Sequence, residues 1–229
     1  MNFDGNFSVI GHIDTGELNF LVSRLTPQHW VSDTTRQRRY DVHAHTQSIG
    51  LLYDQDFRHI QPTTQPPMRM FGDAIKPVLD RLASHYSQTA AGLKLQPQHG
   101  PGYCIRASLV RLNPNNKIDP HEDKNFSLCH SHRVHIPIIT NEQVRFHVGD
   151  QSMAIPVGQI VEINNRREHW VENSSSRGRV HLIIDWVIAG EPCCCAKLTH
   201  PKIPCSKEVC KDTDRMQIEC LCFPLNART

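Results

Sequence analysis

The sequence lacks any segment that would direct it to a membrane or a secretory route. No run approaches the roughly 20 apolar residues that a transmembrane helix needs. The N-terminal stretch from Met1 to Ile10 contains Asp4, has no basic start and is followed by no apolar stretch, unlike a signal peptide. We therefore expect a cytoplasmic protein with no membrane partner.

An excess of charge of one sign is also missing. Lys and Arg number 25 and Asp and Glu number 23, so the formal net charge is +2. The sequence has neither a long basic run nor basic residues interleaved with aromatic ones, which are the usual features of a nucleic-acid-binding surface. We expect no nucleic-acid partner.

The chain has nine cysteines but no C-x-x-C pair. Most of them, with His200 nearby, fall in a tail between Cys193 and Cys222. A tetrahedral zinc site in this tail remains open, although the spacing matches no known zinc module. The alternative, which we favour, is a partly ordered extension whose cysteines stay reduced in the cytoplasm.

The length of 229 residues suits one domain with a full core and an appendage. We predict a domain over residues 1–189, with a barrel core at about 103–188, and a Cys-rich extension over 190–229. Apolar residues at helical spacing predict helices at 17–25 and 71–87. Pro77 would then have to sit in the first turn of the second helix, where its missing N–H costs little. The Gly-, Pro- and Gln-rich stretch 90–102 predicts a connecting loop.

From Tyr103 onward the apolar period changes to two, which indicates half-buried strands. We predict strands at 103–109, 132–139, 143–148, 153–155, 160–163 and 179–187. Short strands joined by turns after a helical N-terminal section are typical of a closed or two-sheet antiparallel barrel. The expected fold class is therefore mainly β.

Three residues of this barrel form a candidate metal site. His121 and Asp123 stand two apart in a locally extended segment, so both side chains point the same way. His169, which we place after another strand end, would supply a third ligand. Two histidines and one carboxylate leave coordination positions open, as an iron(II) oxygenase needs in order to admit a keto acid and dioxygen. H-x-D alone is also common in solvated loops.

Three further residues point to a bound carboxylate. Arg179 starts a strand whose interior set would be Arg179, His181 and Ile183, and its planar fork suits a carboxylate. Arg133 and His135 share one face of an apolar strand, where burial without an anionic partner is costly. Arg106 and Arg111 are equally compatible with the cavity and the surface. Asn164 is a candidate support for His169, or a turn residue.

The segment from Asn113 to Val187 resembles the aspartyl/asparaginyl β-hydroxylase family of iron(II)/2-oxoglutarate oxygenases, which includes bacterial proline hydroxylases. The matching stretches, in order, are His121-x-Asp123, Arg133-Val134-His135-Ile136-Pro137, Thr140-Asn141, Glu162-Ile163-Asn164-Asn165, His169 and Arg179-Val180-His181-Leu182. The resemblance implies a double-stranded β-helix, the cupin-like jelly roll, with N-terminal helices packed on its sheet.

By the same resemblance, His121, Asp123 and His169 would hold iron(II), and Arg179 would bind the distal carboxylate of 2-oxoglutarate. His135 would assist with a co-substrate carboxylate, and Arg133 would face co-substrate or substrate. The reaction implied is hydroxylation, using dioxygen, of an unactivated C–H bond in an amino acid, a peptidyl side chain or a small anionic metabolite. Succinate and CO2 would be released. The alternative is a cupin-like module that binds metal and carboxylate without turnover.

Overall fold

The structure is a computed structural model that describes residues 5–32, 34, 40–53, 62–123 and 126–192. Its first part contains β1 (Phe7–His12), α1 (Gly16–Ser23), α2 (Pro27–Val31), the 3-10 helix η1 (Asp41–His43), β2 (Thr46–Tyr53), β3 (Thr63–Thr64), α4 (Met68–Gln88) and α5 (Ala90–His99). The second part contains β4 (Tyr103–Leu112), β5 (Asn116–His121), α6 (Phe126–Cys129), β6 (His132–Ile139), β7 (Val144–Val148), β8 (Gln151–Met153), β9 (Gln159–Ile163), β10 (His169–Asn173) and β11 (Arg179–Val187).

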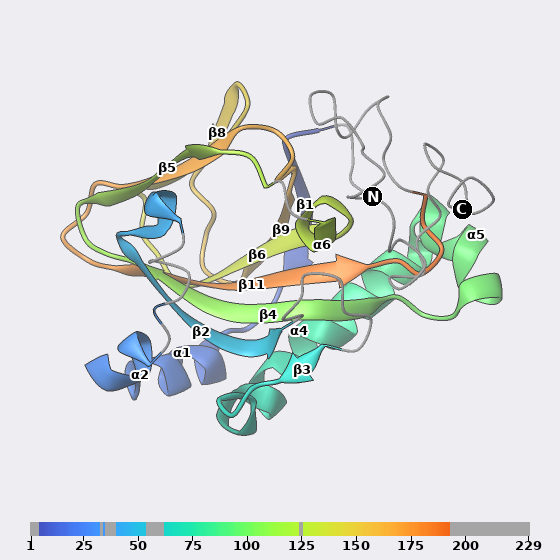
Figure 1. Ribbon diagram of the computed structural model, residues 1–229, viewed down its shortest axis with the longest axis horizontal. Helices are drawn as coiled ribbons and strands as arrows, with labels where there is room; N and C mark the ends of the chain where they lie inside the picture. The colour runs from blue at the N-terminus through green and yellow to red at the C-terminus, as the bar shows by residue number, and fades with distance from the viewer. Residues whose placement is uncertain (1–4, 33, 35–39, 54–61, 124–125, 193–229) are drawn as a thin grey trace.

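The strands form two antiparallel sheets that face each other (Figure 1). The larger sheet has seven strands in the order β1-β9-β6-β11-β4-β2-β3, and the smaller has four in the order β5-β10-β7-β8. From β4 onward the chain passes back and forth between the sheets, with β4, β6, β9 and β11 in the larger sheet and β5, the β7-β8 hairpin and β10 in the smaller one. This arrangement confirms the predicted jelly roll.

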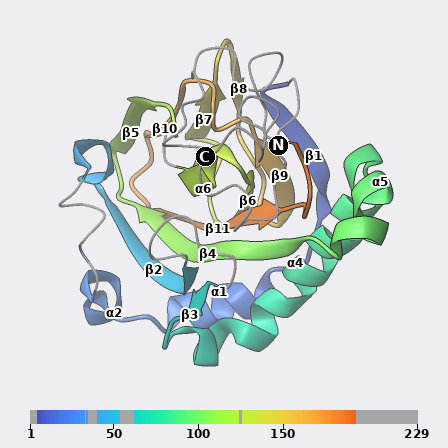
Figure 2. The ribbon, with the colours of Figure 1, turned by 45° about the vertical axis from the view of Figure 1, so that its right-hand side comes forward.

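The N-terminal helices cover the outer face of the larger sheet (Figure 2). Helix α4 buries Phe71, Ile75, Val78 and Leu82 along one side, which is the apolar face that helical spacing predicts. These side chains pack in one core cluster with alternate residues of β6 and β11, including Ile136. The prediction of helices packed on the sheet is confirmed.

A second, smaller apolar cluster fills part of the space between the two sheets. It joins Phe146 and Val148 of the small sheet to Val161 and Leu112 of the large one. On β6 and β11, the residues that point to the helices are apolar, whereas most of those that point inward are polar. The inward polar residues are Arg133, His135, Arg179, His181 and Asp185. The interior is therefore polar beside β6 and β11.

Two details of the helical section differ from the prediction. The predicted loop 90–102 is wrong over its first ten residues, which form helix α5. Composition misled the prediction, because the Thr89 hydroxyl caps this helix by accepting from Gly92 N at 3.0 Å and Leu95 is buried. Helix α4 begins at Met68, so Pro77 lies inside it and not in the first turn.

Within the described residues, no helix is both long and apolar enough to cross a membrane. The thiols of Cys104 and Cys129 donate to the carbonyl oxygens of Arg106 and Asp123, each at 3.2 Å. The tail cysteines lie outside the described residues, so their zinc site stays a prediction, as does the domain boundary at residue 189.

Candidate metal centre

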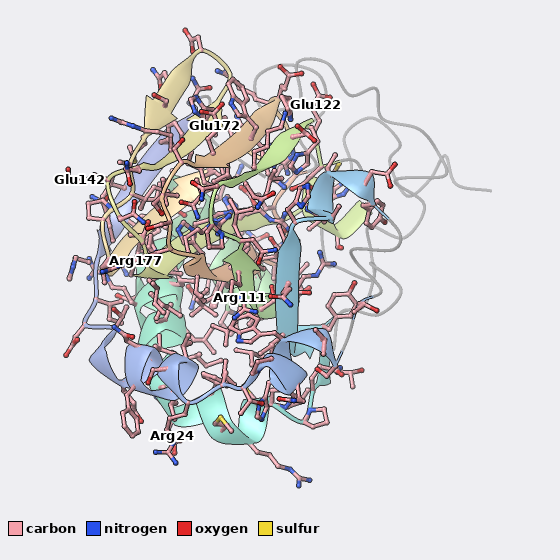
Figure 3. The ribbon with its side chains drawn as sticks, turned by 90° about the vertical axis from the view of Figure 1, so that its left-hand side faces the viewer. Arg24, Arg111, Glu122, Glu142, Glu172 and Arg177 are labelled. Carbon is pink, nitrogen blue, oxygen red and sulfur yellow. The ribbon has the colours of Figure 1, made fainter. Side chains whose placement is uncertain are left out.

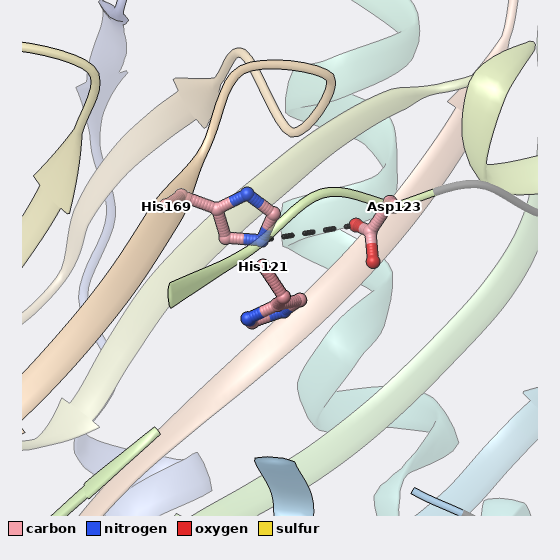
Figure 4. Close-up of side chains that lie close together, drawn as sticks. All are labelled: His121, Asp123 and His169. Carbon is pink, nitrogen blue, oxygen red and sulfur yellow. Dashed lines mark ion pairs between the residues drawn. The ribbon is translucent and has the colours of Figure 1, made fainter. Parts of the chain in front are cut away.

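The structure brings the three predicted metal ligands together at one end of the small sheet. His121 ends β5, His169 begins β10, and the two are direct partners across the antiparallel pair. Asp123 follows two residues after β5. One potential ligand atom from each residue lies within 4.8 Å of the others, and Figure 4 shows the three side chains converging. The sequence predicts His169 after a strand end, and the structure places it after β9 and at the start of β10.

Both histidine rings are oriented by a hydrogen bond from Nδ1 to the backbone carbonyl oxygen two residues earlier. Nδ1 of His121 donates to the carbonyl oxygen of Asp119 at 2.7 Å, and Nδ1 of His169 donates to that of Arg167 at 2.9 Å. Because a carbonyl only accepts, Nδ1 carries the proton and Nε2 keeps its lone pair. Histidine ligands of metals are commonly fixed in this way, with one ring nitrogen donating to the protein and the other facing the ion.

The protonation of His169 agrees with a ligand role. Burial is the main cause that lowers its pKa, and the nearby charge of Asp123 only partly opposes it, so the pKa falls to about 4. The imidazole is therefore neutral near pH 7. Its Nε2 lies 4.0 Å from Oδ2 of Asp123 (Figure 4).

Asp123 is held by residues outside its own strand. Its Oδ2 accepts from Nη1 of Arg133 at 2.7 Å and from Nδ2 of Asn165 at 3.0 Å. Its backbone N–H donates to the carbonyl oxygen of Asn165 at 3.0 Å. Burial would raise the pKa of this carboxyl, but the charge of Arg133, the two nearby histidines and the hydrogen bond from Asn165 together outweigh burial, and the pKa is lowered. Asp123 is therefore an oriented carboxylate at neutral pH.

Aromatic rings connect the metal-ligand cluster to the predicted carboxylate site. Phe146 on β7 stacks on His169 with ring centroids 6.4 Å apart. The same ring meets His135 of the opposite sheet edge-on at 4.8 Å. His135 in turn lies beside His181, with 3.5 Å between their Nδ1 atoms. A row of side chains thus crosses the interior from the metal-ligand cluster to β11.

Arg179, His135 and His181 form a buried, positively polarised group at the end of this row. Burial lowers the pKa of both histidines well below the usual value, and the charge of Arg179 lowers each of them further. Nε2 of each histidine has no hydrogen-bond partner among the described residues. In the hydrogen bond between the two Nδ1 atoms, one neutral ring donates and the other accepts. The donating ring therefore has a lone pair at Nε2, and the accepting ring has an N–H there.

The buried guanidinium of Arg133 pairs with protein carboxylates. Its burial predicts an anionic ligand, but the anions that it contacts are Asp185 and Asp123. Nε and Nη2 donate to Oδ1 and Oδ2 of Asp185 at 2.8 and 2.9 Å, and Nη1 binds Asp123. The unpaired-cation argument therefore does not hold for this residue, and its contact with co-substrate or substrate stays a prediction.

Asp185 and Asn165 are not among the predicted site residues, and Asn164 is predicted either as a support for His169 or as a turn residue. Asp185 continues the interior alternation of Arg179, His181 and Ile183 by one step, a signal that was available. Asn165 binds Asp123, whereas the Asn164 side chain donates to the carbonyl oxygen of Gly5 at 3.0 Å. Adjacent asparagines in a turn carry no periodicity that would separate the two.

The two arginines of β4 fall on opposite faces. Arg106 is buried in the interior, with Nη1 3.5 Å from Oδ2 of Asp185. Arg111 lies on the helix-facing side, where its guanidinium sits 4.6 Å from the centroid of the Trp30 ring (Figure 3). Only Arg106 therefore belongs to the surroundings of the metal-ligand cluster.

Comparison with known proteins agrees with this geometry. The model of the aspartyl/asparaginyl β-hydroxylase family matches residues 78–188, which run from the middle of α4 past the end of β11. Residues 78–188 are therefore similar to the aspartyl/asparaginyl β-hydroxylases. At the general level, this match supports a 2-oxoglutarate- and iron(II)-dependent oxygenase. No curated protein matches the chain.

Solved structures similar to this chain include three from bacteria or viruses. A 2-oxoglutarate/Fe(II) oxygenase family oxidoreductase from Burkholderia pseudomallei is 14% identical, with a TM-score of 0.48 over 77% of this chain and 92% of that one. A viral collagen prolyl hydroxylase from Paramecium bursaria Chlorella virus-1 is 9% identical, with a TM-score of 0.49 over 80% and 96%. A Pseudomonas putida prolyl-4-hydroxylase is 14% identical, with 0.47 over 81% and 94%.

Proposed function

We propose that this chain is an iron(II)- and 2-oxoglutarate-dependent dioxygenase that hydroxylates an unactivated C–H bond. The substrate class is an amino acid, a peptidyl side chain or a related small anionic metabolite, and the by-products are succinate and CO2. The observation that carries the proposal is the convergence of His121, Asp123 and His169 within 4.8 Å at one end of the jelly roll.

The donor set fits iron(II). Two imidazoles whose Nδ1 atoms donate to backbone carbonyls, which leaves Nε2 to face a metal, and one carboxylate are the ligand types of non-haem iron(II) oxygenases. Such oxygenases keep other coordination positions open. His121 and His169 come from one strand pair, and Asp123 is fixed by hydrogen bonds from Arg133 and Asn165. The ligand atoms are therefore arranged before any metal arrives, which lowers the cost of binding.

The interior beyond the metal-ligand cluster fits a dicarboxylate co-substrate. The guanidinium of Arg179 is nearly fully buried and offers the planar fork that carboxylates bind. The rings of His135 and His181 are close enough to Arg179 for its charge to lower their pKa, and one of their two unpartnered Nε2 atoms carries a proton to donate. A 2-oxoglutarate bound here would place one carboxylate at Arg179 and its keto acid end toward the metal ligands.

In this mechanism the protein binds, orients and excludes water. His121 and His169 present lone pairs, Asp123 presents negative charge, and Arg179 neutralises the distal carboxylate. The iron, when bound, would supply the redox chemistry that couples decarboxylation of 2-oxoglutarate to hydroxylation of the substrate. Phe146, stacked against His169, keeps one side of the cluster apolar.

The test is an anaerobic titration with iron(II) and 2-oxoglutarate, followed by the visible metal-to-ligand charge-transfer absorption and by succinate on admission of air. Asp123→Ala and Arg179→Ala are the test variants. Asp119→Ala is matched to the first, since its carboxylate is in an exposed pair with Lys117. Arg177→Ala is matched to the second, since Arg177 is exposed two positions earlier (Figure 3).

The proposal expects the absorption band in wild type and in both matched controls, with a weakened band in both test variants. Succinate should form in proportion to the band. No band and no succinate in the wild type would overturn the ligand assignment and favour the metal- and carboxylate-binding module. A band without succinate, across a screen of amino acids and peptides, would favour the same alternative.

A further inference from the structure

Three buried charges lie side by side across the strands next to the metal-ligand cluster. Asp185 on β11 is the strand partner of Arg106 on β4 and of Arg133 on β6. The three residues therefore share one register, and their side chains point into the space between the sheets. Asp185 is completely buried, and both arginines are more than nine-tenths buried.

The contacts inside this row have a definite order. Arg106 lies 3.5 Å from Oδ2 of Asp185 through Nη1, and its Nη2 donates to Oγ of Ser127 at 3.1 Å. Arg133 binds both oxygens of Asp185 in a two-point fork at 2.8 and 2.9 Å. That fork uses Nε and Nη2, so the Nη1 nitrogen remains to donate to Asp123 at 2.7 Å.

The fork decides how Arg133 meets the metal ligand. A guanidinium left with a single carboxylate prefers a two-point pair with it. Arg133 makes its two-point pair with Asp185. Only one of its nitrogens, Nη1, is then left to donate to Oδ2 of Asp123. Without the Asp185 charge, Arg133 would be drawn toward Asp123, where it would compete with a cation for the carboxylate and repel that cation.

We propose that Asp185 is a positioning residue of the metal centre, acting through Arg133 to orient Asp123 and to offset the positive charge beside the ion. The inference rests on the proposed metal-binding role of His121, Asp123 and His169. Partners that orient metal ligands from behind typically change metal affinity by roughly 10- to 100-fold when removed. We expect an effect of that size from the loss of the Asp185 charge.

The test uses Mn(II) as the probe, bound to the full-length apoprotein and quantified by the electron paramagnetic resonance signal of the free ion. Asp185→Asn keeps the shape of the side chain and removes its charge. Glu162→Gln is the matched control, because Glu162 is an equally buried carboxylate of the same sheet that pairs with His132 at 2.7 Å. Its partners, His132 and Tyr86, make no contact with Asp123 that the structure describes.

Thermal unfolding of the apoproteins is measured in parallel. We expect both variants to unfold at lower temperature than wild type, since each loses a buried ion pair. Only Asp185→Asn should raise the Mn(II) dissociation constant, by tenfold or more, while Glu162→Gln stays within twofold of wild type. A purely structural role for Asp185 would give the two variants the same affinity, and that result would overturn the inference.

A second variant keeps the test decisive if Asp185→Asn fails to fold. Arg133→Lys keeps the positive charge but has one nitrogen in place of the fork, so it cannot serve both carboxylates with the same geometry. It too should weaken Mn(II) binding by tenfold or more, and wild-type affinity in folded Arg133→Lys would overturn the inference. If wild type itself binds no Mn(II), the proposed metal centre fails first.

Discussion

At the residue scale, the site depends on which atoms carry protons. The two ligand histidines lock their Nδ1 protons onto backbone carbonyls, and burial keeps His169 neutral. Arg179 is buried where its fork matters and its charge is permanent, so lysine is not an equivalent replacement. Single atoms, rather than residue types, therefore decide whether this cluster binds a metal and a carboxylate.

Arg179→Lys should weaken 2-oxoglutarate binding about 10- to 100-fold, because a point charge replaces a two-point hydrogen-bonding fork. The measurement is the anaerobic charge-transfer titration with 2-oxoglutarate at saturating iron(II). Arg177→Lys, the same change at an exposed position, should leave the dissociation constant unchanged. Equal affinities in wild type and Arg179→Lys would rule out Arg179 as the anchor.

At the element scale, polar and aromatic contacts add to the apolar packing where the end of α4 meets the large sheet. The end of α4 donates from the Tyr86 hydroxyl to Oε2 of Glu162 at 3.1 Å, and Tyr86 stacks on Trp186 at 6.0 Å. His132 lies between Glu162 and Glu191, with contacts of 2.7 and 2.8 Å. This buried polar group lies outside the metal site and links α4, β6 and β9.

The His132 group predicts a fall in stability on the alkaline side. Burial lowers the pKa of His132, but Glu191 and Glu162 outweigh it and raise the pKa from 6.5 to about 9. A pKa raised by folding stabilises the folded state fully below the unfolded value, and this contribution is lost as pH rises through the folded value. The free energy of unfolding should therefore decline between pH 6.5 and 9.

Urea unfolding across that pH range measures the effect. His132→Gln should be less stable than wild type near pH 6 and should approach it at pH 9 and above. His45→Gln, the same change at an exposed position, should follow the wild-type curve. If the difference between wild type and His132→Gln is constant with pH, His132 is not charged in the folded protein.

The corner between α4 and α5 requires glycine. A Cβ built on Gly92 would lie 1.9 Å from the carbonyl oxygen of Tyr86, whereas the nearest atom to one on Gly72 is Sδ of Met68 at 3.9 Å. Gly92→Ala should thus lower the free energy of unfolding by at least about 2 kcal/mol. Gly72→Ala, also helical, should raise it by roughly 0.5–1 kcal/mol, since alanine favours helix. Denaturant unfolding distinguishes the two, and a neutral Gly92→Ala would contradict the close approach.

At the scale of the whole molecule, the site exists because two sheets face each other. The small sheet supplies His121 and His169, and the large sheet supplies Arg133, His135 and Arg179. Ligand binding should therefore stabilise the entire fold and not a single loop. A ligand that binds only the folded state stabilises it by RT ln(1 + [L]/Kd), which is about 2.7 kcal/mol at 100 times Kd.

Mn(II) and 2-oxoglutarate together should raise the unfolding temperature of wild type by several degrees at saturating concentrations. The same additions should leave Asp123→Ala nearly unshifted, while Asp119→Ala should respond as wild type does. Differential scanning fluorimetry under argon provides the measurement. A full shift in Asp123→Ala would mean that the ligands bind elsewhere.

The fold was largely predictable because its signal is periodic and local. Alternation of apolar residues marks β6 and β11, and the apolar spacing of Ile75, Val78 and Leu82 marks α4. Helix α5 was missed because a cap at Thr89 and burial of Leu95 outweighed a Gly- and Pro-rich composition. The beginning of α4 was also missed, since Met68 follows two prolines and carries no periodic signal.

The sequence by itself determined which residue types lie on which faces of the strands. It singled out His121, Asp123, His169 and Arg179, because alternation and spacing are properties of the chain alone. Only the tertiary structure decided what those faces meet. In the folded chain Arg133 pairs with Asp185, Asn165 rather than Asn164 binds Asp123, and Arg111 contacts Trp30 on the helix side. Such partners depend on the register between strands that are far apart in the chain.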